Sequence, residues 1–204
     1  MQDAHAASRP REPQIPLEML ASVHELNRRF LDLVSCRPPG WSPGTRGSSA
    51  AVSAQVAPLS AAQKSAASNC PYALFDLRFE DGCHWQTRLR AVGHWNIADV
   101  TADGATLEFT RLALFFAWHV AATAKLAAQV LLGMQEATVA AFREAPIGCL
   151  PSLAASEAAH LTARWNDCAR YWRALTEAAS GCDAAELRRI QLSGLQLAAA
   201  ARLA

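Results

Sequence analysis

The 204-residue sequence lacks the features by which several large classes of protein are recognised. Its six cysteines include no C-x-x-C pair, and ligand pairs at that spacing are what allow a zinc site to be recognised in a sequence. Neither sign of charge dominates, because 19 Lys and Arg stand against 18 Asp and Glu. A protein that binds nucleic acid by itself needs clustered positive charge, so that class is not expected.

Long apolar runs are also missing. The most apolar stretch, residues 112–124, is followed by Lys125 and is shorter than the about 20 residues that a membrane-spanning helix needs. The opening residues, MQDAHAASRPREPQIP, contain no apolar segment typical of a signal peptide. We therefore expect a cytoplasmic protein that does not enter a membrane and whose cysteines are reduced thiols.

Catalytic motifs are absent as well, since G-x-S-x-G, H-E-x-x-H and a glycine-rich phosphate loop do not occur. His84, His94 and His160 have no carboxylate or nucleophile at motif spacing. We expect no enzyme and no cofactor. One alternative rests on Trp118-His119, where a histidine buried in an apolar helix would bind a metal ion or a small molecule.

The sequence does contain apolar faces at helical spacing. Alanine is abundant and β-branched residues are few, so the pattern predicts an all-α, compact helical bundle. A first helix is expected from Pro16 to near Ser35. Its apolar face consists of Met19, Val23, Leu26, Phe30 and Leu33.

Composition divides the chain into a disordered tail at 1–15, a first helical unit at 16–103 and a second helical unit at 104–204. The first unit contains a Pro/Gly/Ser-rich stretch at 36–57, which predicts a long loop. A capping box at Ser60 and Gln63 predicts a short helix. Residues 72–79 fit a helix or a strand, and a further short helix is expected at 83–92.

The second unit should consist of helices throughout. Residues 106–134 predict one apolar helix that ends at Gly133. Further helices are expected at about 135–144, 151–164 and 168–179. The last helix should begin at Asp183, whose side chain can cap it.

Several residues of the first unit recur in the second unit at an offset of 86 residues. Identical residues fall on one helix face and in one Arg-aromatic-x-Asp element. In that element Arg78 and Asp81 recur as Arg164 and Asp167, and Phe79 meets Trp165. The echo leaves two alternatives open: an internal pseudo-dimer of two related helical units, or chance agreement in an alanine-rich chain. The helix-face matches are Leu26, Phe30 and Val34 with Leu112, Phe116 and Val120.

The second unit resembles the FlhD-type subunit of the bacterial flagellar master regulator. The order of its features carries the resemblance: a long apolar helix, a glycine-containing helix end, a short helix, an Arg-aromatic turn and a closing helix. The first unit contains a partial second copy of the turn. The matching segments are Leu131-Leu132-Gly133-Met134, Ala140-Ala141-Phe142, Ser152-Leu153-Ala154-Ala155-Ser156, Arg164-Trp165-Asn166-Asp167, Ser193-Gly194-Leu195-Gln196-Leu197 and, in the first unit, Leu77-Arg78-Phe79-Glu80-Asp81.

This resemblance implies an all-helical, cytoplasmic co-regulator of transcription in flagellum biogenesis. Such subunits pair with one another and act with an FlhC-type subunit that supplies much of the DNA contact. Leu131 and Leu192 stand where the family has an arginine and a histidine. DNA is therefore expected to be bound only through the complex. A helical adaptor or scaffold with no link to DNA is the alternative.

Two sets of residues are candidates for function. Arg170, Tyr171, Trp172 and Arg173 have the composition that protein interfaces favour and predict a partner-binding cluster. The recurrent turn residues Arg78, Asp81, Arg164 and Asp167 fit a recognition surface or, as we favour, partly exposed ion pairs and caps.

Overall fold

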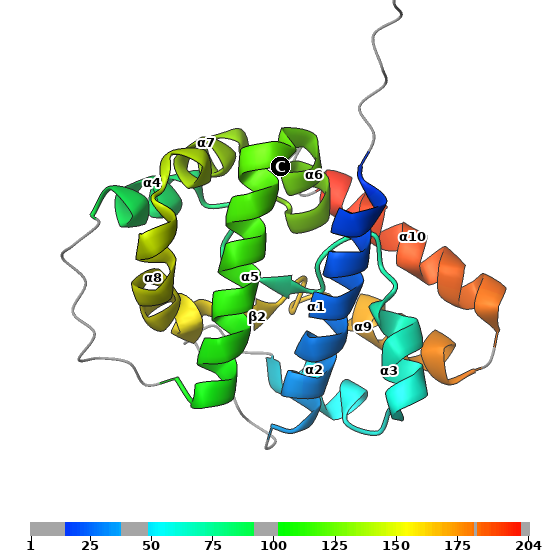
Figure 1. Ribbon diagram of the computed structural model, residues 1–204. Helices are drawn as coiled ribbons and strands as arrows, with labels where there is room; N and C mark the ends of the chain where they lie inside the picture. Colours follow the sequence, from blue (N-terminus) through cyan, green and yellow to red (C-terminus); the bar gives the residue numbers. More distant parts are fainter. Residues whose placement is uncertain (1–14, 38–48, 92–101, 182, 201–204) are drawn as a thin grey trace, which may run out of the picture.

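The computed structural model describes residues 15–37, 49–91, 102–181 and 183–200 (Figure 1). The expected disordered tail, apart from Ile15, and positions 38–48 of the expected loop lie outside these ranges. Helices make up most of the described chain, and its strands are one pair of two residues each, which confirms the all-α prediction. No described helix is long and apolar enough to cross a membrane.

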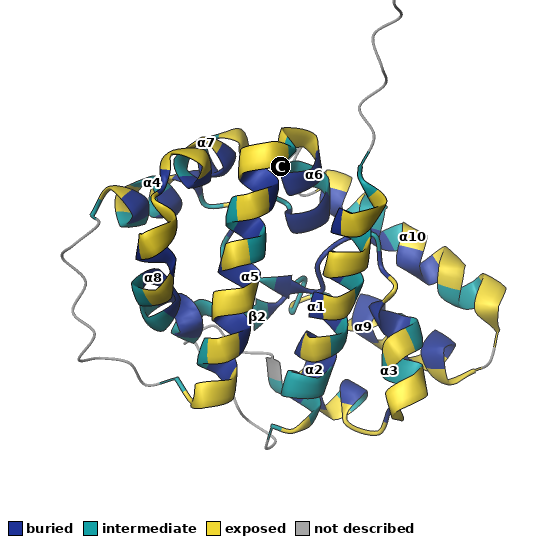
Figure 2. Cartoon of the chain, in the orientation of Figure 1, coloured by how far each residue is buried: buried dark blue, intermediate teal, exposed yellow. Residues whose placement is uncertain are grey.

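The helices enclose one apolar core (Figure 2). Helices α1 and α5 lie side by side in front of the strand pair, with α7 and α8 on the far side of α5 and α3 on the far side of α1 (Figure 1). In chain order the elements are α1 (Leu17–Ser35), α2 (Ser49–Val56), α3 (Ala61–Ser68), β1 (Phe75–Asp76), α4 (Gly82–Arg90), α5 (Gly104–Thr123), α6 (Lys125–Leu132), α7 (Glu136–Glu144), η2 (Ile147–Cys149), α8 (Leu150–Glu157), η3 (Ala158–His160), β2 (Thr162–Ala163), α9 (Ala169–Ser180) and α10 (Ala184–Ala200).

Several helices begin where the sequence predicts. The capping box is formed, because Ser60 N donates to Gln63 Oε1 at 2.8 Å and Gln63 N donates to Ser60 Oγ at 3.3 Å. Asp183 Oδ1 accepts the amide of Glu186 at 3.1 Å and caps α10. Helix α1 buries the predicted apolar face, with Leu33 partly buried at its edge.

The predicted loop at 36–57 is wrong for its last third, because residues 49–56 form α2. Val52 and Val56 lie one turn apart and are both buried in the core. The Oγ of Ser53 donates to Val34 O at 2.8 Å and ties α2 to the end of α1. Alanine-rich composition supports this helix, but the burial that holds it depends on α1 and is not visible in the local sequence.

The single helix predicted for 106–134 is also wrong. Helix α5 ends at Thr123, Ala124 adopts φ −148° and ψ 82°, and α6 begins at Lys125. Alanine favours helix, so nothing in the local sequence marks this break. The new direction buries Ala127, Ala128, Leu131 and Leu132 on one face of α6. Gly133 does end α6 as predicted, with φ 75° in the left-handed region where glycine carries no steric penalty.

The helix predicted for 151–164 is shorter than expected. Helix α8 gives way to η3 and then to β2, which pairs with β1 in an antiparallel arrangement. The pairing partners are Phe75 with Ala163 and Asp76 with Thr162. Phe75 is buried and packs against Phe109 of α5, with ring centroids 5.0 Å apart. Of the stretch 72–79, for which the sequence left helix and strand open, only Phe75 and Asp76 form a strand, and the other residues are turns, bends and irregular backbone.

The order of elements recurs along the chain at a spacing of 87 residues, one more than the echo in the sequence. Four pairs of elements begin 87 residues apart: α1 and α5, α2 and α7, β1 and β2, and α4 and α9. Helices α3 and α8 begin 89 residues apart.

Candidate functional site

The first recurrent turn contains a partly exposed ion pair and a helix cap. Arg78 Nη2 lies 2.8 Å from Asp81 Oδ2, and Asp81 Oδ1 accepts the amide of His84 at 2.9 Å, which caps α4. That amide, followed by the Arg78 hydrogen bond and charge, lowers the pKa of Asp81 despite partial burial. Phe79 lies in the core. Arg78 has φ 59°, and its carbonyl accepts Trp85 Nε1–H at 3.0 Å.

The second turn repeats the backbone feature but uses its arginine differently. Trp165 has φ 51°, and Trp172 Nε1–H donates to Arg164 O at 2.9 Å. The guanidinium of Arg164 lies 4.8 Å from the centroid of the Trp165 ring and donates to Leu131 O at 3.4 Å. Asp167 is exposed. Arg164 therefore connects the turn to the end of α6.

The predicted partner-binding cluster at 170–173 does not form one surface. Tyr171 and Trp172 are buried, whereas Arg170 and Arg173 are exposed. Successive residues of an α-helix are about 100° apart, so four consecutive side chains cannot share a face. The prediction of Tyr171 and Trp172 as contact residues is wrong. The two arginines remain candidates.

The hypothesis of a buried histidine in the apolar helix is wrong too. His119 is exposed on α5, while Trp118 Nε1–H donates to Ala145 O at 2.9 Å. In the described part of the chain, no three His, Cys, Asp or Glu side chains are grouped so that they could hold a metal ion. Five cysteines are described and all of them are free thiols.

Four side chains that the sequence analysis did not connect meet at a buried carboxylate. We call His84, Arg88, Glu157 and His160 the ionic junction. Glu157 Oε2 lies 2.9 Å from His84 Nε2, and its Oε1 accepts Arg88 Nε–H at 2.7 Å. The Glu157 side chain is 1% exposed, that of His84 13% and that of Arg88 31%. The ring of His160 lies edge-on to that of His84, with centroids 5.8 Å apart.

The charges in this junction explain its pKa shifts. Burial opposes the charged form of Glu157, but the His84 hydrogen bond and the charges of His84 and Arg88 outweigh it, so the pKa of Glu157 is lowered. Burial lowers the pKa of His160, which Glu157 partly offsets, and neighbouring cationic groups lower it further. His84 and Glu157 are 73 positions apart, so no local motif could have predicted their contact.

A second polar cluster lies at the contact between the first unit and α9 and α10. We call Cys70, Tyr72, Tyr171 and Gln191 the tyrosine junction. Tyr72 Oη donates to Gln191 O at 2.6 Å and lies 2.7 Å from Tyr171 Oη. Tyr171 Oη lies 3.8 Å from Cys70 Sγ. Burial raises the pKa of Cys70 to about 12 and raises the pKa values of both tyrosines, so the cluster is uncharged near neutral pH.

The two junctions occupy corresponding places in the recurring pattern. Cys70 and Glu157 are 87 residues apart, and so are His84 and Tyr171. Each junction connects a helix of one unit, α4 or α9, to the segment before the strand of the other unit. One connection is ionic and the other is neutral.

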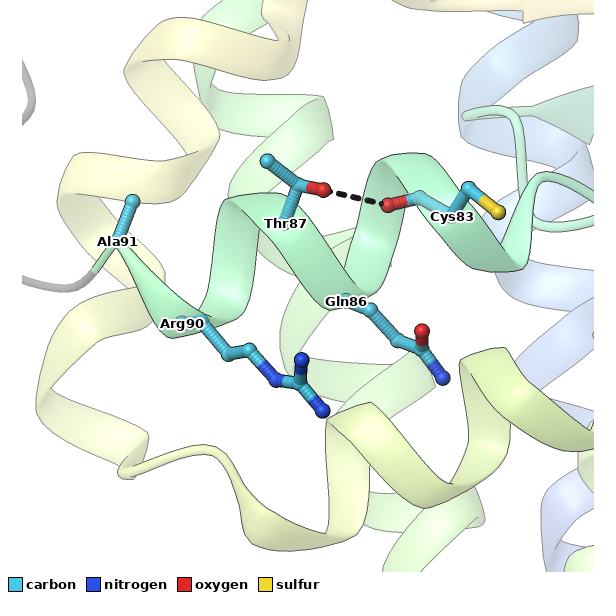
Figure 3. A pocket seen from close by; sticks show the side chains of 5 residues that line it. All are labelled: Cys83, Gln86, Thr87, Arg90 and Ala91. Atoms are coloured by element: carbon cyan, nitrogen blue, oxygen red, sulfur yellow. Dashed lines mark hydrogen bonds between the residues drawn. The ribbon is translucent and has the colours of Figure 1, made fainter.

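The outer face of α4 carries a shallow hollow of about 470 Å³ (Figure 3). The residues that line it are Cys83, Gln86, Thr87, Arg90 and Ala91. They all come from α4 and the residue after it. The hydroxyl of Thr87 is engaged with Cys83 O at 2.9 Å. Among the described residues that line this hollow, Cys83 and Arg90 are the ones with an ionisable side chain.

No family model, curated protein or solved structure matches the chain.

Proposed function

We propose that this protein is an FlhD-like co-regulator of transcription that acts through protein contacts within a DNA-binding complex. The observation that carries the proposal is the ordered set of sequence segments similar to the FlhD family. In the fold these segments occupy the end of α6, helices α7 and α8, the turn after β2, and α10. The near-neutral charge agrees with a subunit whose partner provides the cations for DNA.

We further propose that the chain is an internal pseudo-dimer. FlhD-type subunits pair with one another, and a duplicated chain would hold both units in one molecule. The recurrence at 87 residues supports this, and it includes the two strands that pair with each other. Trp85 and Trp172, also 87 residues apart, both donate to a carbonyl of the preceding turn, that of Arg78 seven residues earlier and that of Arg164 eight residues earlier. Unrelated halves would not be expected to share these features.

Arg170 and Arg173 are the residues we propose for partner contact. Both are exposed on α9, and arginine is enriched in protein interfaces. Glu177 lies one turn further along the same helix and is also exposed. An acidic surface on the partner would complement the two arginines.

Co-expression with an FlhC-type subunit, followed by affinity capture and a DNA mobility-shift assay, tests the proposal. We expect a stable complex, and a DNA shift that needs both proteins. The double variant Arg170→Glu and Arg173→Glu should weaken capture at least tenfold, whereas Arg143→Glu, an exposed arginine on α7, should not. Failure of the wild-type chain to bind the FlhC-type subunit would contradict the proposal and favour a DNA-independent adaptor.

A further inference from the structure

We propose that the ionic junction is an acid-sensitive tie between the two units, with Glu157 as its anchor and His160 as its sensor. The tie holds α4 of the first unit against α8 and η3 of the second. The tyrosine junction, at the corresponding place, stays closed over the same pH range. This inference does not depend on the proposed role in transcription.

The Glu157 carboxylate is the single anion of the ionic junction, and three basic side chains lie around it: His84, Arg88 and His160. Both oxygens of Glu157 are engaged from α4, one by His84 and the other by Arg88. His160 adds a second imidazole next to the first. At neutral pH the carboxylate is balanced by Arg88. A proton on His160 therefore adds positive charge for which the junction has no second carboxylate.

The groups around the junction reinforce this imbalance. Arg78, in the turn before α4, acts on His160 through its charge, although Asp81 pairs with it. From α4 the junction is faced by His84 and Arg88, from α8 by Glu157 and from η3 by His160. Charged side chains of the neighbouring α5 and α7 are exposed to solvent: Glu108, Arg111, Glu136, Arg143 and Glu144.

The direction of the pH effect follows from the free energies of protonation. A histidine whose pKa is lower in the folded protein than in the unfolded chain binds fewer protons when folded. Its contribution to stability is complete above the ordinary value of 6.5 and is lost as the pH falls through the folded pKa. Glu157 acts in the same direction at lower pH, because its pKa is lowered from 4.5. Acid therefore loosens the tie in two stages, first through His160 and then through Glu157.

The tyrosine junction gives an internal reference. Its thiol and hydroxyl groups are neutral, and the pKa values of all three are raised away from neutrality. Protons added between pH 7.5 and pH 5 therefore titrate none of its thiol and hydroxyl groups. His24 of α1, whose pKa is lowered by burial and by the charge of Arg188 on α10, lies outside this junction. Helix α9, which carries Tyr171, should keep its protection from hydrogen exchange while α4 loses part of its own.

Hydrogen exchange measured by mass spectrometry on the full chain at pH 7.5 and pH 5.0, corrected for intrinsic exchange rates, tests the proposal. Protection of the amides in 82–90 should fall by about three- to tenfold at the lower pH. Protection in 169–180 should change by less than about twofold. An equal fall in both helices would overturn the proposal, and so would no fall in α4.

Two variants show whether the loss of α4 protection at pH 5.0 comes from protonation of His160 or from a general loss of stability. His160→Asn should keep the protection of α4 at pH 7.5 and remove most of its fall at pH 5.0. His119→Asn, the matched change at an exposed histidine, should respond as the wild type does. Equal responses of the two variants would overturn the role of His160.

A titration of the wild-type histidines by nuclear magnetic resonance keeps the test valid even if a variant fails to fold. His160 should titrate below 6.5. A His160 pKa at or above that value would overturn the proposal, because the folded protein would then bind the proton at least as well as the unfolded chain.

Discussion

The ionic junction and the tyrosine junction occupy corresponding places in the two units but are made of different chemistry. One holds an ionised carboxylate whose two oxygens are taken by His84 and Arg88. The other contains the thiol of Cys70 and the hydroxyls of Tyr171 and Tyr72, and the Tyr72 hydroxyl donates to Gln191 O. At two places 87 residues apart, the chain thus buries a charged group in one and neutral groups in the other. In both places the buried polar groups have hydrogen-bonding partners, as buried polar groups generally do.

The largest expected effect on stability concerns Trp85 and Trp172, the two buried tryptophans that lie 87 residues apart. Trp85→Ala and Trp172→Ala should each lower the free energy of unfolding by about 4 kcal/mol, because each removes a fully buried indole and a hydrogen bond to the preceding turn. Urea denaturation measures both. A large loss in one variant and a loss below about 1 kcal/mol in the other would break the correspondence of the units.

The next effect tests where the junctions differ. Glu157→Ala should lower the free energy of unfolding by about 3 kcal/mol, because it leaves Arg88 and His84 without their buried carboxylate. Cys70→Ala, the change at the corresponding position, should cost about 1 kcal/mol, since it leaves no unpaired charge. Chemical denaturation at pH 7.5 compares the two. Equal losses would show that the charge of Glu157 adds nothing to the junction.

A smaller effect tests how closely α10 approaches the tyrosine junction. A Cβ at Gly194 would lie 2.9 Å from Tyr72 Cε1 and closer still to its hydroxyl. Tyr72 is fully buried and cannot move aside, so Gly194→Ala should cost about 2 kcal/mol and increase hydrogen exchange in α10.

Gly148→Ala is the matched control, because no atom lies within 4 Å of a Cβ added there. It should leave stability unchanged or raise it by about 0.5 kcal/mol. An equal response of the two variants would contradict the close packing of α10 on Tyr72.

Prediction from the sequence succeeded where a local signal was sufficient. The spacing of Val23, Leu26 and Phe30 on α1 reports one helical face, and the side chains of Ser60 and Asp183 mark the starts of α3 and α10. Each of these signals lies within a few residues of the structure that it predicts.

The candidate site was much less accessible. The residue types of Tyr171 and Trp172 predict an interface. Both side chains are buried instead, because the rotation of the helix about its axis decides which of its residues face the core. The contact of His84 with Glu157 joins residues 73 positions apart. The break at Ala124 occurs in a sequence that favours a continuous helix. Information of this kind exists only when the elements pack together.

The sequence alone determined that this chain folds as helices, because apolar periodicity, alanine content and capping residues act over one or two turns. It also determined the order of segments on which the FlhD resemblance rests. Only the tertiary structure decided which polar side chains are buried and with whom they pair. That choice depends on groups far apart in the chain, and each buried charge or hydroxyl is stable only where packing brings it a partner.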